Sequence, residues 1–161
     1  LDYRSYTWKS KEEVAVYSNM VAEHCDIIIG GREEFDNLEI DIAPNDRTDE
    51  ATAARWFERR AQVVVVKHGG NGSVVYTRNG ESYKAGIFPS NNVIKTFGAG
   101  DSFAGAFIYG LMQGWPIPKC QKYGSASASI VVSSHSCSDA MPSLAKIEQF
   151  LEAFKEKQIR L

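Results

Sequence analysis

The chain has 161 residues, of which 43% are hydrophobic and 24% are charged, and its formal net charge at pH 7 is -2. This length predicts about one domain, and the near balance of charge excludes a strongly basic nucleic-acid-binding protein and a wholly acidic disordered chain. No apolar run approaches the roughly 18 residues of a membrane-spanning helix, so we expect no membrane partner. The three cysteines are widely spaced and odd in number, which disfavours a disulfide framework or a zinc site and favours a cytoplasmic location.

Residues 10–24 predict the first helix. Ser10 is a good N-cap, and Glu13 follows three residues later, which is the spacing of a capping box. The helical period places a set of large apolar side chains on one face, which we expect to be buried. This set comprises Val14, Tyr17, Met20 and Val21.

Two short β-branched runs predict buried parallel strands, because strands covered on both faces are continuously apolar. Helical segments with a polar loop between them separate the two runs. In chain order, these elements are a strand at 26–29, a helix beginning at 32–38, a loop with Pro44 at 41–50, a helix at 51–60 and a strand at 62–67.

The pattern changes after residue 68. The glycine-rich residues 69–72 predict a tight turn, and two short strands around Arg78-Asn79-Gly80 predict a hairpin. The alternation of strands and helices predicts a three-layer α/β fold with a mostly parallel sheet in one domain, residues 1–161. The remaining elements are strands at 73–77 and 81–84 and helices at 101–113, 119–134 and 143–157.

The stretch 95–103, Lys-Thr-Phe-Gly-Ala-Gly-Asp-Ser-Phe, places three small residues before a helix that opens with Asp101. The glycines let the backbone approach a ligand, and the N–H groups of the first helical turn favour an anion such as phosphate. An aspartate would repel that phosphate, so Asp101 makes better sense as a general base for an attacking hydroxyl. The alternative is that Asp101 is only a favourable charge in the first turn of the helix.

These residues resemble the C-terminal signature of the ribokinase-like, or PfkB, carbohydrate kinases. Further similar segments follow in the family's order, which implies a ribokinase-like fold and the nucleotide-binding portion of a kinase domain. Family members are longer and the chain begins with Leu1, so we expect a C-terminal portion that lacks the N-terminal half and the lid. The similar segments are Asp2-Tyr3-Arg4, Gly31-Arg32-Glu33-Glu34, 66–72, Trp115-Pro116-Ile117-Pro118, 124–130 and Met141-Pro142.

The resemblance also implies roles for individual residues. Asp101 matches the catalytic base, and Glu34 matches the glutamate that organises Mg²⁺ through water. The backbone N–H groups of Gly98, Ala99 and Gly100 match the anion hole. The residues that match positions lining the ATP are Lys67, Gly69, Gly72, Gly100 and Ser125.

A monovalent cation, usually potassium, is a further implication of the resemblance. Its ligands in the family are backbone carbonyls, and the matching positions are Lys95, Phe97, Val131, Ser134, Ser136 and Ala140. Lys95 stands where most of the family has aspartate, and a lysine ammonium near a cation site disfavours potassium. Two other departures are Gly31 in place of asparagine and Lys67 in place of threonine; Lys67 either reaches a phosphate or ends a strand in solvent.

For several other residues, we expect a structural role and no direct role in ligand binding or catalysis. His68 adjoins the glycine-rich turn, and we expect it to be non-catalytic. The aromatic side chains Phe103, Phe107 and Tyr109 are expected in the core. Gly105 and Gly110 weaken the helix in which they lie, so close packing against a neighbouring element is the expected reason for both.

The branch of the family that is most similar acts on a sugar acid, 5-dehydro-2-deoxygluconate. This similarity lies in the segments DYRSYTW, IIIGGREEF, KTFGAGDS and GSASASIVVSSHSCSDAMP. It implies transfer of a phosphoryl group from ATP to a hydroxyl of that substrate. One alternative is another sugar kinase, of the 2-keto-3-deoxygluconate or fructose type. The other is a non-catalytic nucleotide-binding or oligomerisation module that forms a homodimer through an exposed sheet edge.

Overall fold

The computed structural model describes residues 1, 3–43, 45–90 and 92–159, so the predictions for Asp2 and Pro44 lie outside the described residues. The chain divides into two compact units, Leu1–Lys84 and Ala85–Leu161. The first is an α/β unit, and the second is built from helices. Within the described part of the chain, no helix is long and apolar enough to cross a bilayer.

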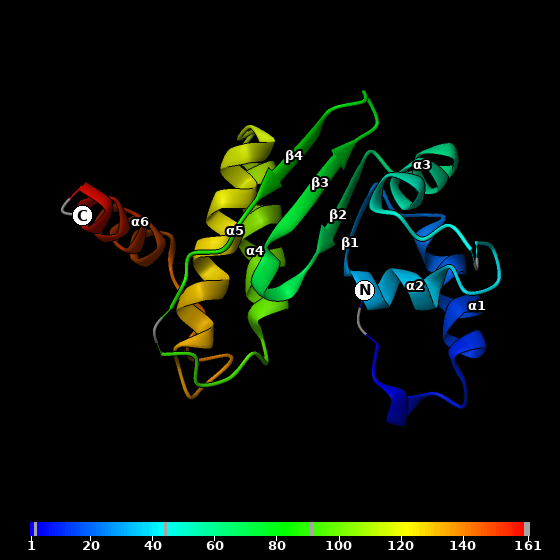
Figure 1. Cartoon of the computed structure of the whole chain (residues 1–161), viewed down its shortest axis with the longest axis horizontal. Helices are drawn as coiled ribbons and strands as arrows, with labels where there is room; N and C mark the ends of the chain where they lie inside the picture. The colour runs from blue at the N-terminus through cyan, green and yellow to red at the C-terminus, as the bar shows by residue number, and fades with distance from the viewer. Residues whose placement is uncertain (2, 44, 91, 160–161) are drawn as a thin grey trace. The chain divides into compact units, whose positions relative to one another are not determined.

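A four-stranded sheet with the order β1-β2-β3-β4 organises the first unit (Figure 1). Strands β1 and β2 are parallel, and their register pairs Ile27 with Val63 and Gly31 with Lys67. Strand β3 is antiparallel to β2, so the sheet is mixed, whereas a mostly parallel sheet was expected. The predicted strands are confirmed at β1 (Ile27–Gly31), β2 (Val63–Lys67), β3 (Ser73–Thr77) and β4 (Ser82–Ala85).

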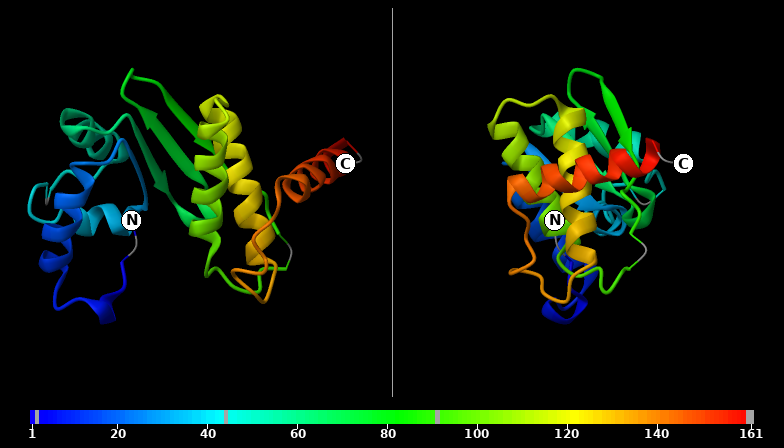
Figure 2. Two further views of the ribbon diagram at one scale, coloured as in Figure 1. Left: turned by 180° about the vertical axis from the view of Figure 1, so that it is seen from behind. Right: turned by 90° about the vertical axis from the view of Figure 1, so that its left-hand side faces the viewer.

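The described part of the first unit also has three α-helices and two short 3-10 helices, and α1 packs against α2 (Figure 2). Helix α2 contacts β1, and helix α3 contacts β2 and β3. Phe35 of α2 and Trp56 of α3 are fully buried against Val64 and Val66 of β2, which makes this cluster the core of the unit. The helices are η1 (Ser5–Thr7), α1 (Lys11–Ala22), α2 (Arg32–Leu38), α3 (Asp49–Arg59) and η2 (Gly69–Asn71).

The start of α1 follows the prediction, but its buried face does not. Ser10 accepts a hydrogen bond from the Glu13 N–H at 3.2 Å, as the capping pattern requires. Val14 is buried, whereas the other members of the expected apolar face, Tyr17, Met20 and Val21, are each more than half exposed. The buried face instead consists of Val14, Ala15 and Ala22, because small side chains let α1 pack closely against α2.

The second unit consists of α4 (Ala99–Met112), α5 (Ile117–Val132) and α6 (Leu144–Ile159). Helices α4 and α5 run side by side in both views of Figure 2. Their close approach depends on Gly110 and Gly124: a Cβ atom at Gly110 would lie 2.9 Å from the Cys120 Sγ, and one at Gly124 would lie 2.9 Å from the Phe103 ring. The packing explanation is therefore confirmed for Gly110.

Gly105 differs from Gly110, because a Cβ atom there would meet nothing within 4 Å. Close packing is therefore not the reason for a glycine at this position. Phe103 and Phe107 are buried as predicted, and their rings stack with centroids 5.9 Å apart. The prediction for Tyr109 is wrong, because its side chain is 42% exposed.

Candidate functional site

The carboxyl ends of β1 and β2 bring two of the predicted site segments together. Gly31 ends β1 and lies opposite Lys67, which ends β2. The chain continues from Gly31 into α2, which carries Glu34, and from Lys67 into the glycine-rich turn. Ligands commonly bind beyond the carboxyl ends of parallel strands, so this edge is a suitable place for a nucleotide.

The carboxylate of Glu34 is fixed at this edge by its own helix. Its Oε2 atom accepts a hydrogen bond from the Gly31 N–H at 2.5 Å, which caps the N-terminus of α2. A carboxylate held in this way keeps a defined position, which suits a ligand that acts on Mg²⁺ through ordered water. The structure thus shows Glu34 as a helix cap, and its role toward a metal ion remains a prediction.

The turn after β2 has the backbone geometry that its glycines predict. Gly69 and Gly72 have φ values of 55° and 90°, which side chains other than glycine rarely adopt. The His68 N–H donates to the Gly72 carbonyl at 2.8 Å, and the Asn71 N–H donates to the His68 carbonyl at 3.0 Å. The turn is therefore closed on itself, with His68 at its base.

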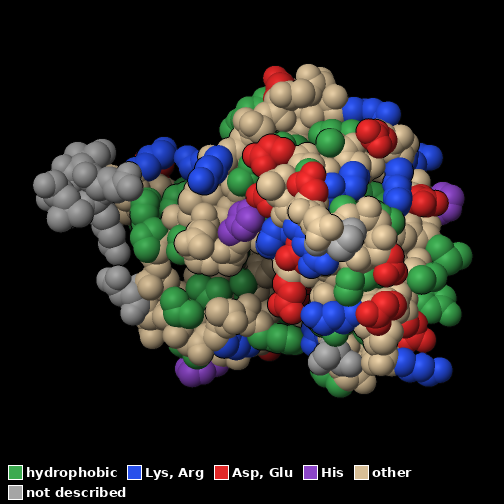
Figure 3. Space-filling view, turned by 45° about the vertical axis from the view of Figure 1, so that its right-hand side comes forward, with side chains coloured by type: hydrophobic (Ala, Val, Ile, Leu, Met, Phe, Trp, Pro, Cys, Tyr) green, Lys and Arg blue, Asp and Glu red, His purple; other side chains and the backbone are tan. Residues whose placement is uncertain are grey.

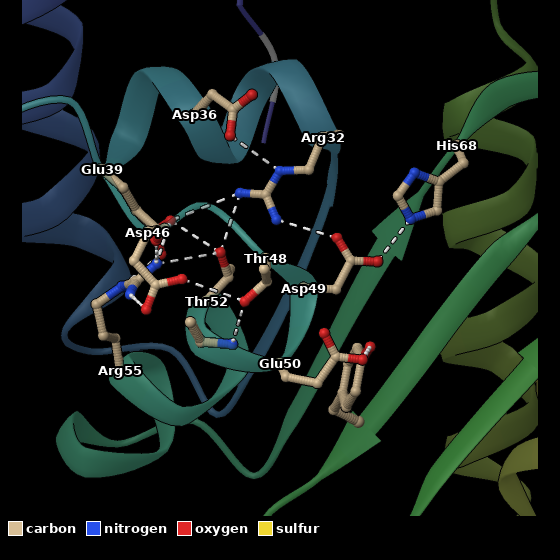
Figure 4. A network of polar contacts seen from close by, with 12 residues as sticks. Arg32, Asp36, Glu39, Asp46, Thr48, Asp49, Glu50, Thr52, Arg55 and His68 are labelled. Carbon is tan, nitrogen blue, oxygen red and sulfur yellow. Dashed lines mark hydrogen bonds and ion pairs between the residues drawn. The ribbon is translucent and has the colours of Figure 1, made fainter. Parts of the chain in front are cut away.

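A network of polar side chains links this turn to the start of α2 (Figure 4). The Nε2 atom of His68 lies 2.7 Å from the Oδ2 atom of Asp49, at the start of α3. The other oxygen of Asp49 accepts a hydrogen bond from the Arg32 guanidinium at 3.1 Å. Arg32 is the first residue of α2, so Asp49 connects the helix that carries Glu34 to the glycine-rich turn.

The same network contains a fully buried carboxylate, that of Glu39. Its Oε2 atom accepts hydrogen bonds from Arg55 at 2.9 Å and from the Thr52 hydroxyl at 2.8 Å, and it lies 3.5 Å from Arg32. The two guanidinium groups and the hydroxyl offset the cost of burying this charge. Nearby, burial and a hydrogen bond to Glu50 raise the pKa of Tyr76.

In the second unit, the predicted anion hole lies where α4 begins. Gly98 is the N-cap and has a φ value of 84°, in the left-handed region that glycine adopts readily. The Ala99 N–H donates to the Thr96 carbonyl at 3.2 Å, which is a long hydrogen bond within the turn. Asp101 lies in the first turn of α4 with an exposed side chain.

A cavity of about 420 Å³ opens beside Asp101. Asp101, Gly105 and Tyr109 are spaced by four residues on α4, so they share the helix face that lines it. Gly105 therefore leaves space at the cavity wall. The four-residue spacing on α4 is a signal in the sequence for its cavity-lining face, whereas no such signal marks the cavity residues on the other elements. Those residues include Tyr123 and Ser127 of α5 together with Met141, Pro142, Leu144 and Ile147.

The residues predicted to hold a monovalent cation show a poor fit to that ion. The Lys95 Nζ atom lies 3.1 Å from the Cys137 Sγ atom, and that thiol donates to the Phe97 carbonyl at 3.2 Å. The ammonium nitrogen is thus within about 6 Å of a carbonyl expected to bind potassium. A positive charge held this close to a carbonyl disfavours a second cation at that carbonyl.

The remaining predicted ligand positions lie near the end of α5. The Val131 carbonyl accepts a hydrogen bond from the Ser134 N–H at 3.0 Å, and the Ser136 hydroxyl donates to Asp139 at 2.9 Å. Ala140 is buried, and Ser125, which matches a position lining the ATP, is buried within α5. These positions keep their predicted roles only as hypotheses.

Charged side chains of both signs lie interspersed on the face shown in Figure 3. Most of them lie on the right-hand part of this view, where Lys and Arg side chains lie among Asp and Glu side chains. This distribution agrees with the near-zero net charge of the sequence. This face does not show the single-sign basic surface that is typical of nucleic-acid-binding proteins.

The chain is 61% identical over 155 residues to a 5-dehydro-2-deoxygluconokinase of Geobacillus thermodenitrificans, and the match covers 96% of this chain and 45% of that protein. A 5-dehydro-2-deoxygluconokinase 2 of Bacillus cereus is 57% identical, over 97% of this chain and 47% of its own length. The chain thus spans about half the length of the curated relatives it matches. The predicted similarity to this branch of the family is confirmed.

The structure is also similar to solved structures of other proteins. The ribokinase of Thermotoga maritima has a TM-score of 0.75 and 26% identity, over 83% of this chain and 44% of that one. An E. coli structure in complex with ATP and Mg²⁺ has a TM-score of 0.77 and 26% identity, over 89% of this chain and 46% of its own. The ribokinase-like α/β fold is therefore confirmed. The family model for pfkB family carbohydrate kinases matches residues 1–144, and the chain belongs to that family.

Proposed function

We propose that the protein transfers the γ-phosphoryl group of ATP to a hydroxyl of a sugar acid, 5-dehydro-2-deoxygluconate. The observation that carries this proposal is the position of Asp101, in the first turn of α4 directly after the left-handed Gly98 and at the wall of a cavity. This arrangement combines a carboxylate, N–H groups suited to an anion and space for a substrate. The names of the relatives at 57–61% identity support the choice of sugar acid.

The chemistry that follows is a direct displacement at phosphorus. The Asp101 carboxylate takes the proton of the substrate hydroxyl as that oxygen forms its bond to the γ-phosphorus. The bond between the γ-phosphorus and the bridging oxygen breaks, and ADP leaves with that oxygen. The N–H groups at Gly98, Ala99 and Gly100 stabilise the negative charge on the phosphoryl oxygens during transfer.

The nucleotide and its metal ion engage further residues in this proposal. Lys67, Gly69, Gly72 and Ser125 line the ATP, and Glu34 holds Mg²⁺ through water. The ion supplies positive charge beside the phosphates when it is bound. Two observations support these roles: the backbone of the 68–72 turn is fixed by its own hydrogen bonds, and the Glu34 carboxylate is fixed by the Gly31 N–H.

Calorimetric titration of the chain with Mg²⁺ and a non-hydrolysable ATP analogue tests the phosphate site. We expect saturable binding that weakens at least 10-fold in Gly98→Ala, because a Cβ atom at a φ of 84° strains the turn and meets Cys137 at 3.1 Å. Gly80→Ala is the matched control, since Gly80 has a φ of 90° in the hairpin turn with nothing within 4 Å. Equal affinity in both variants would contradict the proposed anion hole.

A further inference from the structure

Potassium fits poorly at the start of α4. Two carbonyls expected to bind the ion, those of Phe97 and Val131, already accept hydrogen bonds from Cys137 and Ser134. The Lys95 ammonium lies beside the same thiol. A positive charge that belongs to the protein is therefore already present in this region.

We propose that the ammonium group of Lys95 is a built-in cation that replaces the monovalent metal ion beside the anion-binding turn. The protein then needs no potassium at this position. Lys95 acts here as a positioning residue, because it acts on the turn through Cys137 and through its own backbone. The inference concerns the same site as the proposed kinase function and rests on that function only for the expected location of the cation.

Backbone hydrogen bonds place Lys95 at the C-terminal end of α5. The N–H groups of Ile94 and Lys95 both donate to the Val132 carbonyl, at 2.8 and 3.3 Å. Val132 is the last residue of α5, where the helix dipole concentrates negative partial charge. A cation is stabilised at such a helix end, and a covalently attached one is held there without the entropic cost of binding a free ion.

The contact with Cys137 links this charge to the turn. The Cys137 Sγ atom lies 3.1 Å from Lys95 Nζ and 3.2 Å from the Phe97 carbonyl oxygen, and it would lie 3.1 Å from a Cβ atom at Gly98. The thiol thus fills the space between the ammonium group and the left-handed residue that begins α4. In this proposal, removal of the lysine side chain takes away the resident charge and lets a potassium ion approach the Phe97 carbonyl oxygen.

Thermal unfolding of the chain in different chloride salts tests this proposal without any turnover. The melting temperature, Tm, is compared in KCl and in tetramethylammonium chloride at equal ionic strength, because the organic cation is too large to enter such a site. We expect the same Tm for the natural sequence in both salts. Lys95→Ala has a lower Tm, and KCl raises it by about 2–4 °C over the organic salt.

Three further variants sharpen the test. Lys95→Arg keeps the charge, so its Tm stays independent of potassium. Lys122→Ala, an exposed lysine on α5, controls for the loss of a positive charge and responds equally to both salts. Lys95→Met retains an aliphatic side chain and replaces Lys95→Ala if that variant does not fold.

Two results would overturn the proposal. One is a natural sequence whose Tm rises by several degrees in KCl, and the other is a Lys95 variant that responds to KCl no more than Lys122→Ala does. Neither result bears on phosphoryl transfer, because Tm is measured without substrate. Failure of this inference is therefore distinct from failure of the proposed function.

Discussion

Asp101→Asn lowers the kcat of phosphoryl transfer by about 10²–10⁴-fold, which is the usual contribution of a general base. The amide has nearly the same shape as the carboxylate, but it cannot take the proton of the attacking hydroxyl. The affinity for the ATP analogue stays the same or rises slightly, because the substitution removes a negative charge near the phosphates. The measurement is steady-state kinetics on the chain joined to the N-terminal half of the Geobacillus thermodenitrificans relative, together with calorimetry.

A lowered kcat with an unchanged affinity for the ATP analogue distinguishes a catalytic role of Asp101 from a structural one. Asp41→Asn, at an exposed aspartate of the first unit, is the control for the loss of one carboxylate and leaves both quantities unchanged. If Asp101 were only a favourable charge at the start of α4, its substitution would cost about 0.3–1 kcal/mol of stability and leave kcat nearly intact. Such a result would rule out Asp101 as the base.

Glu39→Ala lowers the free energy of unfolding by about 3–5 kcal/mol, which is the range for breaking a buried ion pair by removing one partner. Glu39 is 0% exposed and receives two guanidinium groups, so its removal leaves Arg32 and Arg55 without their shared carboxylate. Small domains have a total stability of about 5–15 kcal/mol, so this loss is large. Urea denaturation of the chain measures it.

Asp46→Ala is the matched control for this prediction. Asp46 also faces Arg55, at 3.9 Å, but its side chain is 64% exposed. Exposed ion pairs contribute about 0–1 kcal/mol, so the control unfolds at nearly the urea concentration of the natural sequence. If the two variants lost equal stability, burial of Glu39 would not be what makes its ion pairs important.

The helices and strands could be predicted from the sequence because their signals are local. The β-branched runs gave β1 and β2, and the Ser10 cap gave the start of α1. The buried face of α1 could not be predicted in the same way, because the local pattern does not show that alanines would face α2 in place of the larger apolar side chains. Contacts with α2 orient α1. The amide nitrogen of Asn19, for example, donates a hydrogen bond to the Leu38 carbonyl at the end of α2 at 2.7 Å.

The parts of the candidate site that could be predicted consist of residues that lie close together in the sequence. The left-handed Gly98, the start of α4 and the closed turn at 69–72 each follow from glycines in a short stretch. The contacts of His68 with Asp49 and of Lys95 with Cys137 join residues 19 and 42 positions apart. No periodicity links such positions, because the sheet order and the packing of the second unit bring them together.

The most direct test of the proposed function is a phosphorylation assay with three substrates. The chain, joined to the N-terminal half of the Geobacillus thermodenitrificans relative, is supplied with Mg²⁺–ATP and either 5-dehydro-2-deoxygluconate, 2-keto-3-deoxygluconate or fructose. We expect the first to be phosphorylated with the highest kcat/KM. If the joined protein bound the ATP analogue and phosphorylated none of the three, while the intact relative was active under the same conditions, the assignment of this half as the catalytic portion of a sugar-acid kinase would be wrong.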